Sequence, residues 1–371
     1  MIIFSKTKIL GYGMKTLNHS YMSRLDHLRF FAAALVILYH CRGSIKYTGG
    51  ISGFNDIIKL WITGGNTGVS LFLVLSGFLF CIISDAGRKH ISYGSFVKNR
   101  VLRIAPMTVL LCFIAISVSR ATSTPMDILR ILTLQLNTGH PSTGWGNQFY
   151  PVGQIWTIAV EFQFYMIFPF LAVFMRNDGV KTMLGIIMVM LMVKYSLVTF
   201  SNEGIYWTFY HTIIGRLDQF LIGMIAGYFY LKRQSVRLST SLLLSLISLA
   251  GLTTVLYMNK LNNKDFITFS FTVEAVLWAL VIYAYLAAKI SINQKLDAIL
   301  SYLGGLSFSM YLLHLPVYYI LQRKGLSIDP SPSLHIIKVI IITLPVTIIA
   351  SAITYSFIEK PFLKLRVKYA K

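Results

Sequence analysis

The chain has 371 residues, of which 55% are hydrophobic and 13% are charged. Because soluble domains have about 25% charged residues, this composition excludes a soluble globular protein and indicates an integral membrane protein. The formal net charge of +21 would also fit a nucleic-acid-binding protein. No Lys/Arg cluster is interleaved with aromatic residues in a soluble module, however, so we interpret the charge as a determinant of membrane topology and expect no nucleic-acid partner.

Apolar segments of about twenty residues, the length that crosses a bilayer, recur along the chain. They are predicted at 24–43, 65–84, 101–120, 154–175, 180–200, 212–231, 239–258, 268–288, 299–322 and 334–357. The predicted fold is therefore an all-α integral membrane protein, a bundle of about ten transmembrane helices within 24–360. An N-terminal tail (1–23) and a basic C-terminal tail (361–371) flank it. The loops on the side of the N-terminus contain the larger share of Lys and Arg, which predicts that both termini are cytoplasmic.

The first segment places three ionisable side chains on one stripe of a helix. Arg29 and His40 are eleven residues apart, which is three turns plus about 20°, and Asp26 lies one turn before Arg29. The helical rise separates Arg29 from His40 by about 16 Å. Ionisable groups inside a membrane span mark a candidate functional site. Topology predicts Arg29 near the cytoplasm and His40 in the outer half.

Two motifs follow in the second and third segments. The glycine-rich stretch 64–78 indicates close helix packing, and Ser76 within it lacks the context of a nucleophile elbow. Arg100 and Arg103 stand one turn apart, just before Pro106, at the predicted cytoplasmic start of the third segment. Two guanidinium groups beside a helix N-terminus would form a phosphate clamp. Alternatively, they only anchor the adjacent loop on the cytoplasmic side.

The fourth segment contains an acidic residue well inside the predicted span. Glu161 lies about two turns from its outer boundary, and Tyr165 shares its helix face one turn later. A carboxylate in a membrane needs either a partner or a function. The candidate partners are Arg216, Arg29 or His40, and a structural ion pair is the alternative interpretation.

Other polar features are less specific. The loop 121–153 is polar and aromatic in its centre, which fits either an acceptor site or an ordinary surface loop. We expect Asp218 to pair with a neighbouring helix, whereas the sequence does not explain Glu274. His314 is interpreted either as functional or as hydrogen-bonded structure. No His, Asp or Glu spacing indicates a metal, and the three cysteines indicate no disulfide framework.

Taken in order, these motifs resemble the membrane acyltransferase-3 family from residue 24 to residue 361. The matching positions are Arg24, Asp26, Arg29 and His40; Gly68, Ser76 and Gly77; Arg100, Arg103 and Pro106; Trp156, Glu161 and Tyr165; Arg216 and Gly223; Ser309 and His314; and Glu359 and Pro361. The resemblance implies a ten-helix protein of the bacterial cytoplasmic membrane. Such a protein moves an acyl group, usually acetyl, from cytoplasmic acyl-CoA to an extracytoplasmic glycan hydroxyl, as in O-antigen or exopolysaccharide.

The resemblance also implies roles for individual residues. His40 matches the essential histidine of the family, and Asp26 and Arg29 match the charged residues before it. Arg100 and Arg103 match the arginine pair near the donor, and Glu161 matches the acid of the fourth span. Weaker substrate-binding assignments are Trp156, Tyr165, Arg216 and His314. The sequence departs from the family pattern at His27 and at 157–160, which bears on acceptor choice. Some relatives have a further C-terminal esterase-like domain, which we do not expect here.

The sequence thus leads to a mechanistic hypothesis. The phosphates of acetyl-CoA or another acyl-CoA dock at Arg100 and Arg103, and His40 acts either as general base for an acceptor hydroxyl or as a transient acyl carrier. The expected partners are acyl-CoA, a glycan or lipid-linked saccharide, and the bilayer, without a metal. The alternative function is a transporter or flippase for a glycan or an anionic small molecule, which would use Asp218 and Glu274 as relay residues. A purely structural scaffold fits poorly with so many charges inside spans.

Overall fold

The computed structural model describes residues 18, 20–47, 49–138, 152–200, 205–261, 264–327, 329 and 331–371, and these form an all-helical fold, which confirms the predicted fold class. Its α-helices are, in chain order, α1 (Ser23–His40), α2 (Phe54–Thr63), α3 (Thr67–Ile83), α4 (Tyr93–Val118), α5 (Pro125–Leu132), α6 (Trp156–Asp178), α7 (Val180–Phe200), α8 (Ile205–His211), α9 (Ile213–Lys232), α10 (Leu238–Lys260), α11 (Lys264–Ala287), α12 (Gln294–Gly305), α13 (Ser307–Arg323), α14 (Pro332–Lys338), α15 (Leu344–Thr354) and α16 (Lys360–Leu363). Most of the predicted N-terminal tail and the centre of the polar loop, 139–151, lie outside the described residues.

The number of membrane spans depends on how two bent helix pairs are counted. Among the described residues, six helical stretches are long and apolar enough to cross a membrane. The number rises to eight if α2 with α3 and α12 with α13, bent by 64° and 63°, each form one span. Helices α1 and α9 coincide with predicted spans but fail the same test, because charged residues interrupt their apolar sequence. The protein is a multi-pass membrane protein, and the number ten stays a prediction.

Glycine residues bring the central helices close together, as the glycine-rich stretch predicted. A Cβ atom on Gly77 would lie 1.9 Å from the Phe220 carbonyl oxygen of α9. In return, a Cβ atom on Gly223 of α9 would lie 2.1 Å from the Val74 carbonyl oxygen of α3. Only glycine allows this backbone-to-backbone contact on both sides, so α3 and α9 form a fixed central pair.

A network of buried charges joins the helices beside this pair. Lys194 of α7 and Asp218 of α9 form an ion pair of 2.8 Å in which both side chains are 0% exposed. Thr272 of α11 also donates a hydrogen bond to Asp218. The expected pairing of Asp218 with a neighbouring helix is therefore confirmed. Because each polar group has a partner here, the charges tie three helices together away from lipid.

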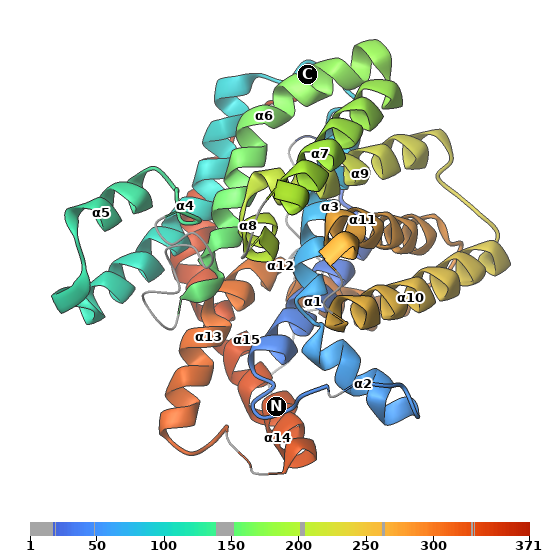
Figure 1. The fold of residues 1–371 in the computed structure, drawn as a ribbon. Coiled ribbons are helices and arrows are strands. Elements are labelled where there is room, and N and C mark those ends of the chain that lie inside the picture. Colours follow the sequence, from blue (N-terminus) through green and yellow to red (C-terminus); the bar gives the residue numbers. More distant parts are fainter. Residues whose placement is uncertain are drawn as a thin grey trace, which may run out of the picture.

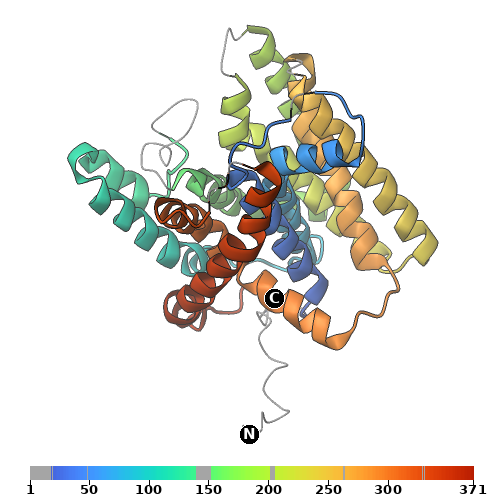
Figure 2. The ribbon, with the colours of Figure 1, turned by 90° about the horizontal axis from the view of Figure 1, so that it is seen from below.

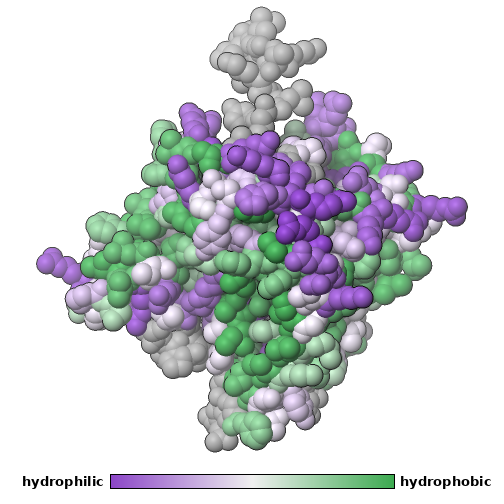
Figure 3. Space-filling view, turned by 90° about the horizontal axis from the view of Figure 1, so that it is seen from above, coloured by the Kyte–Doolittle hydropathy of each residue, from purple (hydrophilic) through white to green (hydrophobic). Residues whose placement is uncertain are grey.

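The arrangement of the helices is clear in two views. In Figure 1, α1 and α3 lie at the centre, α4 and α5 extend to one side, and α10 lies on the other side; Figure 2 shows the same order from below. Seen from above, hydrophilic residues gather toward the upper part of the surface, and hydrophobic residues cover most of the surface beneath them (Figure 3). This distribution fits a helical protein with one polar margin and a lipid-facing band.

Candidate active site

A cavity of about 1440 Å³, including its opening, lies between α1, α3, α4, α6 and α13. The walls are mixed, and their polar and charged members are Asn18, Ser20, Tyr21, Asp26, Arg29, Ser76, Asn99, Arg100, Arg103, Thr157, Glu161, Tyr165, Ser307, Tyr311, Arg366 and Tyr369. The cavity therefore joins the start of α1 to the first half of α4, whose arginines were all predicted near the cytoplasm.

The start of α1 provides an ion pair on the cavity wall. Arg29 contacts Asp26 at 2.6 Å between Nη1 and Oδ1, as their spacing predicted, and the Tyr21 hydroxyl donates to the other carboxylate oxygen at 2.7 Å. Burial and the Asp26 carboxylate raise the pKa of Tyr21, so its hydroxyl remains a donor at neutral pH. A Cβ atom on Gly304 would lie 2.0 Å from the Asp26 carbonyl oxygen, so α12 presses on α1 at this point. Asp26 is thus held in one position and holds Arg29 in turn.

Helix α4 provides two more guanidinium groups. Arg100 is surrounded by the rings of Phe80, Phe96, Tyr165 and Tyr369, whose centroids lie 5.3, 5.6, 5.7 and 5.9 Å from its Cζ. Its Nε is buried and has no hydrogen-bond partner within the described part of the chain. Such an aromatic cage stabilises the cation without neutralising it. Arg100 is therefore a fixed positive charge beside the cavity.

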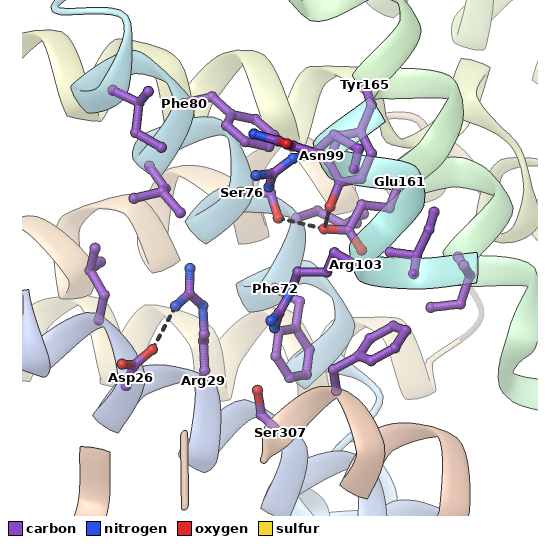
Figure 4. Close-up of a pocket in the computed structure, with 18 of the residues that line it drawn as sticks. Asp26, Arg29, Phe72, Ser76, Phe80, Asn99, Arg103, Glu161, Tyr165 and Ser307 are labelled. Atoms are coloured by element: carbon purple, nitrogen blue, oxygen red, sulfur yellow. Dashed lines mark hydrogen bonds and ion pairs between the residues drawn. The ribbon is translucent and has the colours of Figure 1, made fainter. Parts of the chain in front are cut away.

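The second guanidinium group of α4 reaches the same space. Arg103 lies 5.8 Å from the ring centroid of Phe308 on α13. Figure 4 shows Arg29 and Arg103 reaching into the space between the Asp26 and Glu161 carboxylates. Positive side chains from two helices thus converge on one volume.

One part of the sequence prediction for the arginine pair was wrong. Helix α4 begins at Tyr93, whereas the predicted segment began at residue 101. Arg100 and Arg103 therefore lie two to three turns inside the helix, and its N-terminal N–H groups are not beside them. The apolar count missed the first turns because they alternate exposed polar residues with the buried Phe96 and Asn99. Anion binding here depends on the side chains alone.

Glu161 lies on the opposite wall and is held by hydroxyl groups. It accepts a hydrogen bond from Ser76 of α3 at 3.0 Å and another from Tyr165, one turn later on α6 (Figure 4). Glu161 and Tyr165 lie on the same face of α6, as their spacing predicted. None of the three predicted cationic partners, Arg216, Arg29 or His40, forms an ion pair with Glu161 within the described residues. Hydroxyl donors therefore hold this carboxylate in place on the cavity wall.

His40 does not line the cavity, although it shares α1 with Asp26 and Arg29. Its ring lies 5.1 Å from that of His314 on α13. His314 is 0% exposed, its Nδ1 lies 2.7 Å from the Tyr311 carbonyl oxygen, and its Nε2 is buried without a partner in the described residues. Because a carbonyl only accepts hydrogen bonds, Nδ1 is the protonated nitrogen and Nε2 has a free lone pair. The second histidine of the motif set therefore stands beside the first.

Tyr311 lies between the cavity and the two histidines. Its ring contacts Phe72 on the cavity side at 6.0 Å and His314 at 5.8 Å. Its hydroxyl lies 3.0 Å from Thr157 Oγ1 and donates to the Gln154 carbonyl at 3.1 Å. The predicted stripe is therefore divided, with Asp26 and Arg29 in the cavity and His40 beyond Tyr311.

The weak substrate-binding assignments divide in the same way. Tyr165 lines the cavity, whereas Trp156, Arg216 and His314 do not. Arg216 is 1% exposed, lies 4.0 Å from the ring centroid of Phe271, and donates to the Tyr210 carbonyl at 3.0 Å. Trp156 packs on Tyr210 at 4.8 Å. Arg216 and Trp156 therefore belong to the buried network beside α9.

Sequence reasoning missed several residues of the cavity. Ser76 was set aside as packing, and the C-terminal tail was expected to be separate, yet it supplies Arg366 and Tyr369 to the wall. Asn99 and Tyr311 lie next to predicted residues but have no motif of their own. A signal existed only for Ser76, a hydroxyl about one helical turn after Phe72 on a mostly apolar helix. In the described part of the chain, no group of three or more His, Cys, Asp or Glu side chains could hold a metal ion.

Comparisons with known proteins complete this description. No solved structure matches the chain. The O-acetyltransferase OatA of Staphylococcus aureus strain NCTC 8325 / PS 47 is 25% identical over 375 residues, which cover 93% of this chain and 57% of the relative. A putative O-acetyltransferase of Staphylococcus aureus strain MSSA476 is 25% identical over 378 residues, covering 94% and 58%. The chain thus spans somewhat more than half the length of these relatives. The acyltransferase domain of the acyltransferase-3 family matches residues 22–352, and the chain belongs to this family.

Proposed function

We propose that this protein transfers an acyl group, most simply acetyl, from acyl-CoA to a hydroxyl of a glycan on the other side of the membrane. The observation that supports this proposal most strongly is the cavity with Arg29, Arg100 and Arg103 on its walls. Coenzyme A has a diphosphate and a 3′-phosphate, and guanidinium groups bind phosphate with paired hydrogen bonds. The relatives named O-acetyltransferase support acetyl as the group transferred.

The cavity would hold the donor by its charged end. Arg100 and Arg103 bind the phosphates, and the aromatic cage around Arg100 keeps that charge in place. Arg29, held by Asp26, lies on the route from this end toward Tyr311. Glu161 faces the arginines without pairing with Arg29, so its proposed role is to orient the donor.

Transfer would take place at His40 and His314. In the general-base route, His40 removes the proton of the acceptor hydroxyl as its oxygen attacks the thioester carbonyl. The tetrahedral intermediate then expels the thiolate of coenzyme A, which takes the proton from His40. In the covalent route, the His40 imidazole attacks the carbonyl first, the thiolate leaves, and the hydroxyl then removes the acyl group from the ring. The free lone pair of His314 Nε2 beside His40 fits either route as a proton acceptor.

The thioester can reach His40 only if the Tyr311 side chain, which forms part of the cavity wall, moves aside. Tyr311 lines the cavity, packs against His314 and is 6% exposed, and Phe72 and Thr157 contact it from the cavity wall. We propose that donor binding displaces the Tyr311 ring, which opens a path for the pantetheine arm. The separation of the cavity from the two histidines supports this step.

The alternative function, a transporter or flippase, would use the buried charges beside α9. Those charges are satisfied within the network, because Asp218 binds Lys194 and Thr272 and Glu274 accepts from Ser70 at 3.0 Å. None of these residues lines the cavity. A structural role for the network therefore explains their burial without a relay.

The test uses purified protein in liposomes with acetyl-CoA labelled in the acetyl group and a glycan extract from the bacterial envelope. We expect label in the glycan from the native protein, and a loss of about 10²- to 10⁴-fold for His40→Ala. His90→Ala is the matched control, because His90 is an exposed histidine outside the cavity. Label transport without covalent transfer would favour the transporter, and undiminished transfer by His40→Ala would remove His40 from the mechanism.

A further inference from the structure

The segment that follows α16, residues 364–371, returns across the start of α4 and closes one side of the cavity. The backbone of Lys371 exchanges two hydrogen bonds with that of His90, at 3.0 and 3.1 Å, and Ser92 N donates to the Tyr369 carbonyl at 2.9 Å. Tyr369 is 1% exposed and packs against Phe96 at 5.2 Å. The predicted basic tail is thus a fixed part of the fold.

Asn99 fastens the middle of this segment. Its side-chain Nδ2 donates to the Val367 carbonyl at 2.6 Å, and its Oδ1 accepts from the Val367 N–H at 2.9 Å. Asn99 is 1% exposed and immediately precedes Arg100. One amide therefore fixes the position of the C-terminal segment relative to the arginines of α4.

This attachment brings a third guanidinium group to the arginines of α4. Arg366 lines the cavity, and its Nε donates to the Leu363 carbonyl at 3.0 Å, but it forms no ion pair with any described carboxylate. Burial and the charges of Arg103 and Arg100 lower the pKa of Arg366 to about 10, so it remains charged at neutral pH. Like charges repel, so three guanidinium groups brought together by α4 and the C-terminal segment indicate a site for a multiply charged anion.

We infer that Arg366 is a third phosphate-binding residue of the donor cavity, that Asn99 positions it through Val367, and that the cavity thereby favours donors with several phosphates over donors with fewer. This inference rests on the proposed function, because the donor is taken to be an acyl-CoA. A purely structural Arg366, capping the Leu363 carbonyl, is the alternative that the test must exclude.

The test measures binding of coenzyme A and of dephospho-coenzyme A to the purified full chain by calorimetry at several salt concentrations. For Arg366→Gln we expect roughly tenfold weaker binding of coenzyme A and a shallower salt dependence. The native preference for coenzyme A over its dephospho form should shrink. Arg366→Lys should restore most of the binding, because it keeps the charge. Lys364→Gln is the matched control, since this exposed lysine of the same segment does not line the cavity and should leave binding unchanged.

A double-mutant cycle tests the positioning role of Asn99. Asn99→Ala should weaken binding in the native chain but add little in Arg366→Gln, because both changes remove the same contact. Fully additive losses would show that Asn99 acts independently of Arg366. If Arg366→Gln binds coenzyme A as well as the native chain does, the inference is wrong while the proposed function stands. If the native chain does not bind coenzyme A at all, both are wrong.

Discussion

The cavity and the network beside α9 contain the same kinds of residues, but the charges of the cavity line an open space, whereas those of the network are enclosed by helices. In the network, Lys194 and Asp218 pair with each other, and Glu274 and Arg216 are both hydrogen-bonded to Ser70. In the cavity, Glu161 contacts only hydroxyl groups, and Arg100 contacts aromatic rings. A buried charge that is paired within the protein stabilises an arrangement of helices. A charge that is held in place but not neutralised can act on a ligand.

This difference separates two interpretations of ionisable residues in membrane helices. Their presence in a span marks a candidate functional site, which was the interpretation of Asp26, Arg29 and His40, whereas Asp218 was expected to pair with a neighbouring helix. Their position and their partners together decide between structure and function, because the Asp26–Arg29 pair on the cavity wall can still reach a ligand, whereas the fully buried Lys194–Asp218 pair cannot. Substitutions should therefore affect folding in the network and ligand binding in the cavity.

The largest effect should follow from breaking the ion pair of the network. Asp218→Asn leaves the Lys194 ammonium buried without a counter-charge, which typically costs about 3–5 kcal/mol. We expect a marked loss of thermal stability in detergent, measured by size-exclusion chromatography after heating. Replacing both partners, with Lys194→Met and Asp218→Leu, should recover most of that stability. Asp178→Asn, at an exposed aspartate, is the control, and a stable Asp218→Asn protein would argue against a structural network.

A smaller effect, of the opposite kind, should follow from removing a cavity arginine. Arg100→Gln should weaken coenzyme A binding by about 1.5–3 kcal/mol, since charged hydrogen bonds to phosphate are lost. Thermal stability should change little, because Arg100 has no ion pair to break. The control is Lys98→Gln, at an exposed position two residues earlier on α4. Strong destabilisation with unchanged binding would place Arg100 with the network.

Removing the carboxylate of the cavity should separate binding from turnover. Glu161→Gln removes the negative charge that faces the arginines, so coenzyme A should bind somewhat more tightly, by roughly 0.5–1 kcal/mol. Acyl transfer should nevertheless fall by roughly ten- to a hundredfold, because the donor is oriented less well. Calorimetry and single-turnover assays measure the two effects separately. Weaker binding together with normal turnover would contradict the assigned role.

The local part of the site was predictable, whereas its long-range part was not. The ion pair of Asp26 and Arg29 follows from their spacing on one helix, and so does the contact between Glu161 and Tyr165. Ser76 donates to Glu161, which lies 85 residues later in the sequence. The spacing of residues within one helix cannot predict a partner on another helix. Tyr311, from a distant helix, divides the α1 stripe, which spacing within one helix cannot show.

The helices show the same limit. Apolar length located all the long helices, because a span needs about twenty residues whatever its neighbours are. It misplaced the start of α4, where two amphipathic turns precede the apolar part. It also gave no indication that the C-terminal segment docks, because the hydrogen bonds of His90 and Asn99 to that segment join residues that are far apart in the sequence.

The sharpest comparison uses two serines of α3. Ser70 donates to Glu274 in the network, and Ser76 donates to Glu161 in the cavity, both at 3.0 Å. Alanine at either position removes a hydrogen bond to a carboxylate, with an expected cost of about 1 kcal/mol, and Ser70→Ala also removes an acceptor of Arg216 and Gln219, so its cost should be the larger. Ser70→Ala should lower thermal stability and leave the Michaelis constant for acetyl-CoA unchanged. Ser76→Ala should leave stability nearly unchanged and lower turnover by several-fold.

Since the two serines lie on one helix and donate to the same chemical group at the same distance, each is the control for the other. A loss of stability in both variants would mean that Glu161 is as structural as Glu274, and the cavity would then lose its distinguishing feature. A loss of turnover in both would mean that the network takes part in transfer. Opposite outcomes, measured on the same preparations, would support the view that the partner of a buried charge determines its role.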